Sequence, residues 1–197
     1  EREPASGAVC GIKCRIRVRR APQENPTRWK KHRSLCKLMQ QRPDAGVVAT
    51  KTGADWTEMS DFVRAARGAS PADVIRPEFL FTLQRIKAAG IRAAILSNEL
   101  DLFYGADFRK KLPFLEDFDV IHDATYTKIL KPDPRAYTGV LSDLGLAPEA
   151  CVFVDDQARN IAGARAVGLA TVHFNVQSPA ESYAEAMTLL GLSGETS

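Results

Sequence analysis

The sequence has no apolar run near the roughly 20 residues that cross a bilayer. It also has no apolar segment followed by a small-residue cleavage site, which is the pattern of a secretory signal. Its four cysteines do not form the regular framework of a disulfide scaffold. No segment repeats along the chain. These absences argue against a membrane-spanning, secreted, disulfide-rich or repeat protein, and they predict a cytoplasmic location.

Acidic residues are scarce at the N-terminal end. Residues 1–45 hold 12 Lys/Arg against 4 Asp/Glu, a balance of +8, whereas residues 46–197 balance to −5. Residues 20–45 show no hydrophobic period and are rich in Pro, Gln, Lys and Arg, which predicts an irregular basic arm. The chain starts at Glu1 rather than Met, so we expect a processed or partial product.

Regular alternation of short apolar runs and helical segments begins at about residue 57. Strands are predicted at 91–96, 118–121, 151–154 and 170–174. Helices are predicted at 57–67, 78–89, 100–112, 134–144, 157–167 and from 178 to before Gly191. Strands that alternate with helices of about 10–15 residues indicate βαβ units. The predicted fold class is therefore a doubly wound, Rossmann-like parallel α/β sheet. His122 and His173 fall at or near strand ends without an evident partner.

Two adjacent carboxylates, Asp155 and Asp156, follow the strand predicted at 151–154. In open α/β sheets, ligands bind beyond the carboxyl ends of the strands. Side-by-side carboxylates repel each other unless a cation lies near them, and hard oxygen ligands suit Mg²⁺. The pair is therefore a candidate metal site. The alternative is that one carboxylate caps the helix that follows.

A strand-end hydroxyl and a lysine in a proline-rich turn accompany the acid pair. Ser97 and Asn98 follow the strand at 91–96, and Lys131 begins a Lys-Pro-Asp-Pro turn before a helix. A hydroxyl beside free backbone N–H groups can hold a phosphoryl oxygen, and a lysine can neutralise its charge. With the paired carboxylates, these are the parts of a phosphoryl-transfer site. The alternatives are an ordinary strand-end hydroxyl for Ser97 and a surface lysine for Lys131.

In this order and spacing, the motifs resemble those of the haloacid dehalogenase (HAD)-like hydrolases, most of which are Mg²⁺-dependent phosphatases and some dehalogenases. The matching segments are Ile-Leu-Ser-Asn, Lys-Pro-Asp-Pro-Arg-Ala-Tyr and Val-Phe-Val-Asp-Asp-Gln-Ala-Arg-Asn. The resemblance implies a small phosphate ester or related substrate. It implies that Asp155 and Asp156 hold Mg²⁺, that Ser97 and Asn98 bind the phosphoryl group, and that Lys131 stabilises charge and orients the nucleophile.

The resemblance also implies a domain organisation. We expect a basic arm at 1–50, a partial helical cap with a lead-in helix at 51–90, and an α/β core at 91–197. Substrate specificity lies in caps and loops, so the choice between a phosphorylated and a halogenated substrate stays open. Oligomeric state is open as well.

The first motif of the family, Asp-x-Asp after an N-terminal strand, has no counterpart here. It belongs near residues 8–14, which read Ala-Val-Cys-Gly-Ile-Lys-Cys, and the first aspartate of the chain is Asp44. The alternating cations of residues 12–19 would cost several kcal/mol per ion in a central strand. We therefore expect that the nucleophile strand is missing and that turnover is weak or absent. A frameshifted, truncated or mis-started N-terminus would explain this gap.

Two other functions compete with hydrolysis. One is a degenerate, non-catalytic HAD domain that binds a ligand or a partner. The other is an adaptor whose basic arm, with Trp29, touches nucleic acid, although a solvated tail is the favoured interpretation. Two pairs in the arm, Cys10/Cys14 and His32/Cys36, also have the form of zinc ligands, but their x₃ spacing favours chance.

Overall fold

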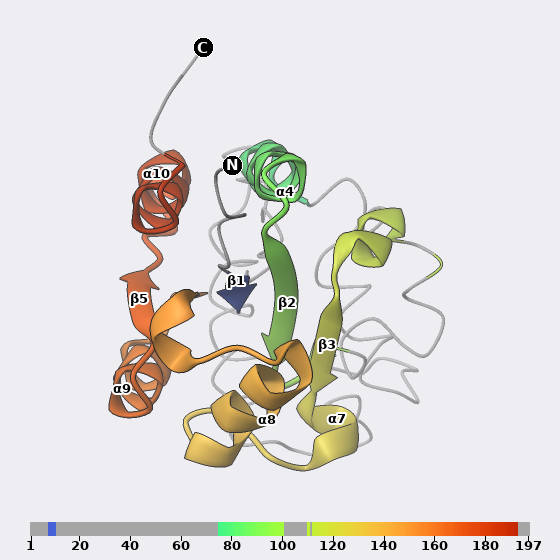
Figure 1. The fold of residues 1–197 in the computed structure, drawn as a ribbon, viewed down its shortest axis with the longest axis vertical. Coiled ribbons are helices and arrows are strands. Elements are labelled where there is room, and N and C mark those ends of the chain that lie inside the picture. Colours follow the sequence, from blue (N-terminus) through green and yellow to red (C-terminus); the bar gives the residue numbers. More distant parts are fainter. Residues whose placement is uncertain (1–7, 11–74, 101–109, 111, 193–197) are drawn as a thin grey trace, which may run out of the picture.

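The computed structural model describes residues 8–10, 75–100, 110 and 112–192. They form a five-stranded sheet in the order β3-β2-β1-β4-β5, in which all neighbouring strands are parallel (Figure 1). The strands are β1 Ala8–Cys10, β2 Arg92–Ser97, β3 Val120–Asp123, β4 Cys151–Asp155 and β5 Ala170–His173. The strands predicted from the sequence are present within one or two residues of their expected bounds. The predicted parallel α/β sheet is therefore confirmed.

The described part of the chain includes five α-helices beside the sheet, together with two short 3-10 helices, Pro113–Asp117 and Pro148–Ala150. The α-helices are α4 Pro77–Ala88, α7 Ala124–Thr127, α8 Pro134–Leu144, α9 Ala158–Ala166 and α10 Pro179–Leu189. The short α7 was not predicted, and the Ser178 side chain makes no capping hydrogen bond at the start of α10. The helix predicted at 57–67, and nearly all of that at 100–112, lies outside the described residues. None of the helices described is long and apolar enough to cross a membrane.

Strand β1 lies at the centre of the sheet. Ala8 pairs with Arg92 of β2 and with Cys151 of β4. The expectation that the chain lacks this strand is therefore wrong: three small residues, placed before the run of alternating cations, fill the position. The absence of an acid is unaffected, because residues 11–14 read Gly-Ile-Lys-Cys. Of the candidate zinc ligands, Cys10 ends β1, whereas Cys14, His32 and Cys36 lie outside the described residues, as does Trp29.

Helices cover both faces of the sheet, α4 and α10 on one and α8 and α9 on the other. Side chains of β4 alternate between these two layers. Val152 and Val154 pack with α4 and α10, whereas Cys151 and Phe153 pack with α8 and α9. A strand buried on both faces explains why this stretch is continuously apolar. Burial also raises the pKa of the Cys151 thiol above its ordinary value, although the charge of Arg92 lowers it in part.

The ends of α8 follow the signals in the sequence. The Asp133 side chain accepts a hydrogen bond from the Arg135 backbone N–H, and Pro134 occupies the first turn. At the other end Gly145 adopts φ +62°, a left-handed conformation that glycine tolerates without a Cβ penalty. The helix therefore starts at a fixed point immediately after the Lys131 turn.

The cap of α8 should depend on pH. Hydrogen bonds from the Arg135 side chain, and then from its backbone, lower the pKa of Asp133 from 3.8 to about 2. A carboxyl whose pKa is depressed by folding stabilises the native state above its unfolded pKa and loses this effect as the pH falls through the folded pKa. Asp133→Asn keeps an acceptor but removes the charge. Thermal melts should show the largest difference between wild type and variant above about pH 5 and a much smaller one near pH 2; a constant difference would contradict this.

Candidate functional site

The carboxyl ends of four strands bring polar residues to one edge of the sheet, here called the carboxyl edge. Ser97 ends β2 opposite Asp123 of β3, and Asp155 ends β4 opposite His173 of β5. Parallel strands in register place these side chains at one level. Lys131 reaches the same edge from the loop between α7 and α8. The structure therefore brings together the strand ends and the turn that the sequence indicated.

Lys131 and Asp155 form a buried ion pair. The Lys131 ammonium donates to Asp155 Oδ2 at 2.8 Å and to the Leu96 carbonyl oxygen at 2.6 Å. Lys131 is 6% exposed and Asp155 is fully buried. The interpretation of Lys131 as a surface lysine is therefore wrong. A buried charge of this kind needs its partner, because removing one ion leaves the other uncompensated.

The lysine ammonium lies across the end of the central strand. Leu96 belongs to β2 and Asp155 to β4, the two strands that flank β1. Cys10, the last residue of β1, pairs with Ala94 of β2 and with Phe153 of β4. Leu96 and Asp155 each follow these partners by two residues. Bridging these two neighbours places the positive charge directly beyond β1, where the sheet topology centres the site.

Among the described residues, three groups donate to the Asp155 carboxylate. They are the Gln157 backbone N–H at 2.8 Å, the Asn160 Nδ2 at 3.1 Å to both oxygens, and the Lys131 ammonium. The bond from Gln157 forms the turn that leads into α9, so Asp155 has a structural as well as an electrostatic role. These contacts occupy the roughly four acceptor positions of a carboxylate. Asp155 therefore does not fit as a ligand of Mg²⁺ unless it gives up one of them.

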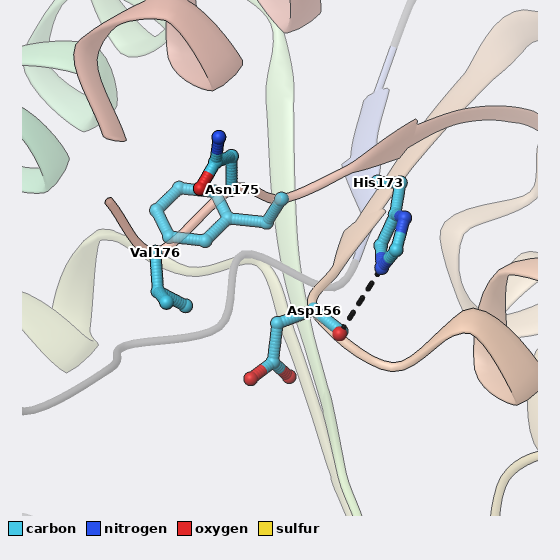
Figure 2. A pocket seen from close by; sticks show the side chains of 5 residues that line it. Asp156, His173, Asn175 and Val176 are labelled. Atoms are coloured by element: carbon cyan, nitrogen blue, oxygen red, sulfur yellow. Dashed lines mark hydrogen bonds between the residues drawn. The ribbon is translucent and has the colours of Figure 1, made fainter. Parts of the chain in front are cut away.

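Asp156 lies at a pocket beyond the carboxyl ends of β4 and β5. The pocket has a volume of about 610 Å³ and is lined by Asp156, His173, Phe174, Asn175 and Val176. In Figure 2 the Asp156 carboxylate points away from His173, while its backbone carbonyl lies 3.2 Å from the imidazole Nε2. Asp155 is fully buried, whereas Asp156 is partly exposed and lines the pocket. Asp156 is therefore the acid that a hard cation could reach.

The described residues contain no group of three or more His, Cys, Asp or Glu side chains that could hold a metal.

The two histidines near strand ends, which showed no evident partner in the sequence, both have one in the structure. His122 Nε2 lies 2.6 Å from Asp143 Oδ2 on α8, and His173 contacts the Asp156 carbonyl. These partners lie 21 and 17 residues away in the sequence, so no local pattern could have revealed them.

Ser97 and Asn98 follow β2 with different contacts. The Ser97 hydroxyl accepts a hydrogen bond from the Glu99 backbone N–H at 3.2 Å. The Asn98 amide pairs with the backbone of Lys131, donating to its carbonyl at 3.1 Å and accepting from its N–H at 2.8 Å. Contact of either side chain with a phosphoryl group stays a prediction.

Asp123 is a residue of the carboxyl edge that sequence reasoning missed. It is 3% exposed, and its Oδ1 accepts from the backbone N–H groups of Leu100 and Thr125 at 3.2 and 2.9 Å. It therefore caps α7 and ties the chain after β2 to the end of β3. The usable signal was an aspartate directly after an apolar strand and before a helical turn.

Tyr137 and Gly163 hold α9 against the lysine turn. The buried Tyr137 hydroxyl donates to the Asn160 carbonyl at 2.8 Å. A Cβ on Gly163 would lie 2.9 Å from the Pro132 Cβ, the Pro132 carbonyl oxygen and the Tyr137 hydroxyl. Close approach of α9 to the turn therefore requires a residue without a Cβ at this position. An isolated glycine inside a helical pattern is a sequence signal of such close packing.

Comparison with known proteins assigns the family. The sequence profile of the haloacid dehalogenase-like hydrolases matches residues 15–168. The chain belongs to this family. It is 36% identical over 108 residues to (S)-2-haloacid dehalogenase 4A of Burkholderia cepacia, a match that covers 54% of this chain and 46% of that protein. It is 31% identical over 110 residues to phosphatase MT3486 of Mycobacterium tuberculosis, covering 55% and 47%. The match thus spans under half the length of both relatives.

Solved structures share the fold of this HAD-like chain. A dehalogenase crystal structure superposes with a TM-score of 0.60 at 22% identity, covering 94% of this chain and 92% of that one. A HAD family enzyme from Bacteroides thetaiotaomicron, solved with magnesium and inorganic phosphate, superposes with a TM-score of 0.52 at 18% identity, covering 84% and 92%. At these identities the likeness shows a common fold.

Proposed function

We propose that this chain is a HAD-like hydrolase domain that binds a small phosphate ester at the carboxyl edge and turns it over weakly or not at all. The observation that carries the proposal is the Lys131 ammonium, buried beside Asp155 beyond the end of β1. Ser97 lies at the end of the next strand, within the same edge. The phosphatase and dehalogenase relatives make a halogenated acid the second candidate substrate.

The charges of this edge constrain how a phosphate could bind. Lys131, Asp155 and Asp156 together carry a formal charge of −1. A phosphate dianion would be repelled by that balance, whereas a divalent cation would reverse its sign. Mg²⁺ commonly binds one or two carboxylates together with substrate phosphates. Asp156 is the carboxylate that would hold it, and the bound ion would neutralise negative charge on the phosphoryl oxygens.

The residues of the chain supply positioning and charge. Asp155 keeps the ammonium of Lys131 fixed and charged, so that it faces negative charge without rearranging. The Ser97 hydroxyl would donate to a phosphoryl oxygen. Asn160 and the Gln157 backbone hold Asp155 in turn. This arrangement supports binding and electrostatic stabilisation of a phosphoryl group.

A nucleophile is the missing part. By resemblance, the family's aspartate follows the N-terminal strand, and β1 occupies the corresponding central position. The next four residues, 11–14, contain no carboxylate. Covalent catalysis splits a difficult step into two easier ones, and losing the attacking group removes that route. The same absence favours the alternative, a non-catalytic HAD domain that binds a ligand or a partner.

The test is an aryl phosphate assay with Mg²⁺, run beside a titration of inorganic phosphate. We expect turnover near the background rate, together with phosphate affinity that rises when Mg²⁺ is added. Asp156→Asn should abolish this Mg²⁺ effect while keeping the fold, because Asp155 forms the buried ion pair. Asp117→Asn, at an exposed acid in the short helix Pro113–Asp117, is the matched control and should change nothing.

Two outcomes would contradict the proposed function. Robust aryl phosphate turnover that is lost in Asp155→Asn would show that a nucleophile is present after all. Absence of phosphate binding with and without Mg²⁺ would reject the phosphate site itself and favour the second candidate substrate.

A further inference from the structure

We propose that Asn98 is a positioning residue that fixes Lys131 at the end of β2, rather than a group that touches substrate. Both ends of its side-chain amide are used on one residue: Nδ2 donates to the Lys131 carbonyl at 3.1 Å, and Oδ1 accepts from the Lys131 N–H at 2.8 Å. A substrate contact would have to displace one of these bonds. The consequence for phosphate binding rests on the proposed function.

The loop that carries Lys131 lacks two of the backbone donors that could attach it to the sheet. It connects α7, which ends at Thr127, to α8, which begins at Pro134. Pro132 and Pro134 have no backbone N–H, so two of the donors that could bond to the sheet are absent. A side-chain amide from the neighbouring strand end supplies the reciprocal pair of bonds that a backbone partner would otherwise give.

The end of β2 thereby sets the position of the ammonium in two ways. The Leu96 carbonyl accepts from the Lys131 ammonium at 2.6 Å, and the Asn98 amide holds the Lys131 backbone. These two contacts come from residues on either side of Ser97. Three consecutive residues therefore have three roles: Leu96 contacts the ammonium, Ser97 is the candidate phosphoryl contact, and Asn98 anchors the lysine loop. This spacing couples the positions of Ser97 and Lys131.

Loss of the anchor should free the lysine before it unfolds the domain. Buried, hydrogen-bonded groups exchange their protons slowly, and exchange speeds up where local structure opens. In wild type we expect a slowly exchanging Lys131 ammonium signal in ¹⁵N-resolved NMR spectra, assigned by its absence in Lys131→Met. Asn98→Ala should speed this exchange by about tenfold or more, the scale expected when two hydrogen bonds that hold the lysine backbone are lost. The signals of β4 should persist.

Two further variants make the experiment specific. Asn98→Asp keeps the acceptor for the Lys131 N–H and loses the donor, so its effect should be intermediate. Asn175→Ala is the matched control, because Asn175 also follows a strand and accepts a backbone N–H, from Gln177 at 2.9 Å, without contacting Lys131. It should leave the Lys131 ammonium signal unchanged.

The results separate this inference from the proposed function. Unchanged ammonium exchange in folded Asn98→Ala would overturn the positioning role. If both Asn98 variants fail to fold, hydrogen exchange of the Lys131 backbone N–H in wild type is measured instead. Rapid exchange of this N–H would equally overturn the positioning role of Asn98. Faster exchange in the variant, combined with a Lys131 signal that ignores added inorganic phosphate, would support the positioning role and reject the phosphate site.

Discussion

Lys131→Met is expected to lower the free energy of unfolding by about 3–5 kcal/mol, the range found when one partner of a buried ion pair is removed. Asp155 is fully buried, so in this variant its carboxylate would stay desolvated without its cation. The methionine retains most of the volume of the lysine stem, which limits any cavity. Chemical denaturation of the two proteins at neutral pH measures the difference.

The double variant Lys131→Met/Asp155→Asn is the control for this result. It removes both charges, and a neutral amide at 155 can still accept from the Gln157 backbone N–H. Most of the lost stability should return, because replacing a whole buried pair by neutral groups is often close to neutral in free energy. A double variant as unstable as Lys131→Met would show that the loss comes from packing and not from an orphaned charge.

Gly163→Ala is expected to destabilise the protein by about 1–3 kcal/mol, the usual range for overpacking. The added Cβ would meet Pro132 and the Tyr137 hydroxyl at 2.9 Å, and one of these contacts is with backbone that cannot turn aside. Because Pro132 follows Lys131, displacement of α9 should also disturb the ion pair. Thermal and denaturant unfolding measure the loss.

Gly139→Ala is the matched control, since Gly139 also lies inside a helix, α8. An added Cβ there would lie 3.4 Å from the His122 ring, an ordinary contact. Replacing a helical glycine with alanine then stabilises by up to about 1 kcal/mol through helix propensity. Equal effects of the two substitutions would contradict the close approach of α9 to the lysine turn.

The sequence was sufficient for the sheet and its helices wherever local signals were strong. Continuous apolar runs predicted the strands because β4 is buried on both faces, and Asp133, Pro134 and Gly145 predicted α8 because they act within a few residues of it. Strand-end placement predicted that Ser97 and Asp155 share an edge. In each case the determining interaction is local or follows from the general geometry of parallel sheets.

Features that depend on distant contacts were not predictable. β1 has three residues, too few for a hydrophobic period, and only pairing with β2 and β4 identifies it. The sequence also could not tell which of two adjacent acids turns toward Lys131. That choice depends on Asn160 and the Gln157 backbone, which fix Asp155 from the following helix and turn. His122 and Asp143 likewise meet only through packing of α8 on β3.

The most direct test of the buried cation as the phosphate-binding group is a calorimetric titration of inorganic phosphate, with Mg²⁺ present, into wild type and the Lys131→Met/Asp155→Asn variant. The double substitution leaves the net charge unchanged, so any loss of affinity reports the position of the ammonium. We expect binding to wild type and an affinity at least about tenfold weaker in the variant, because a preorganised charge is removed. Equal affinity for phosphate in the two proteins would contradict the role of the buried cation in phosphate binding.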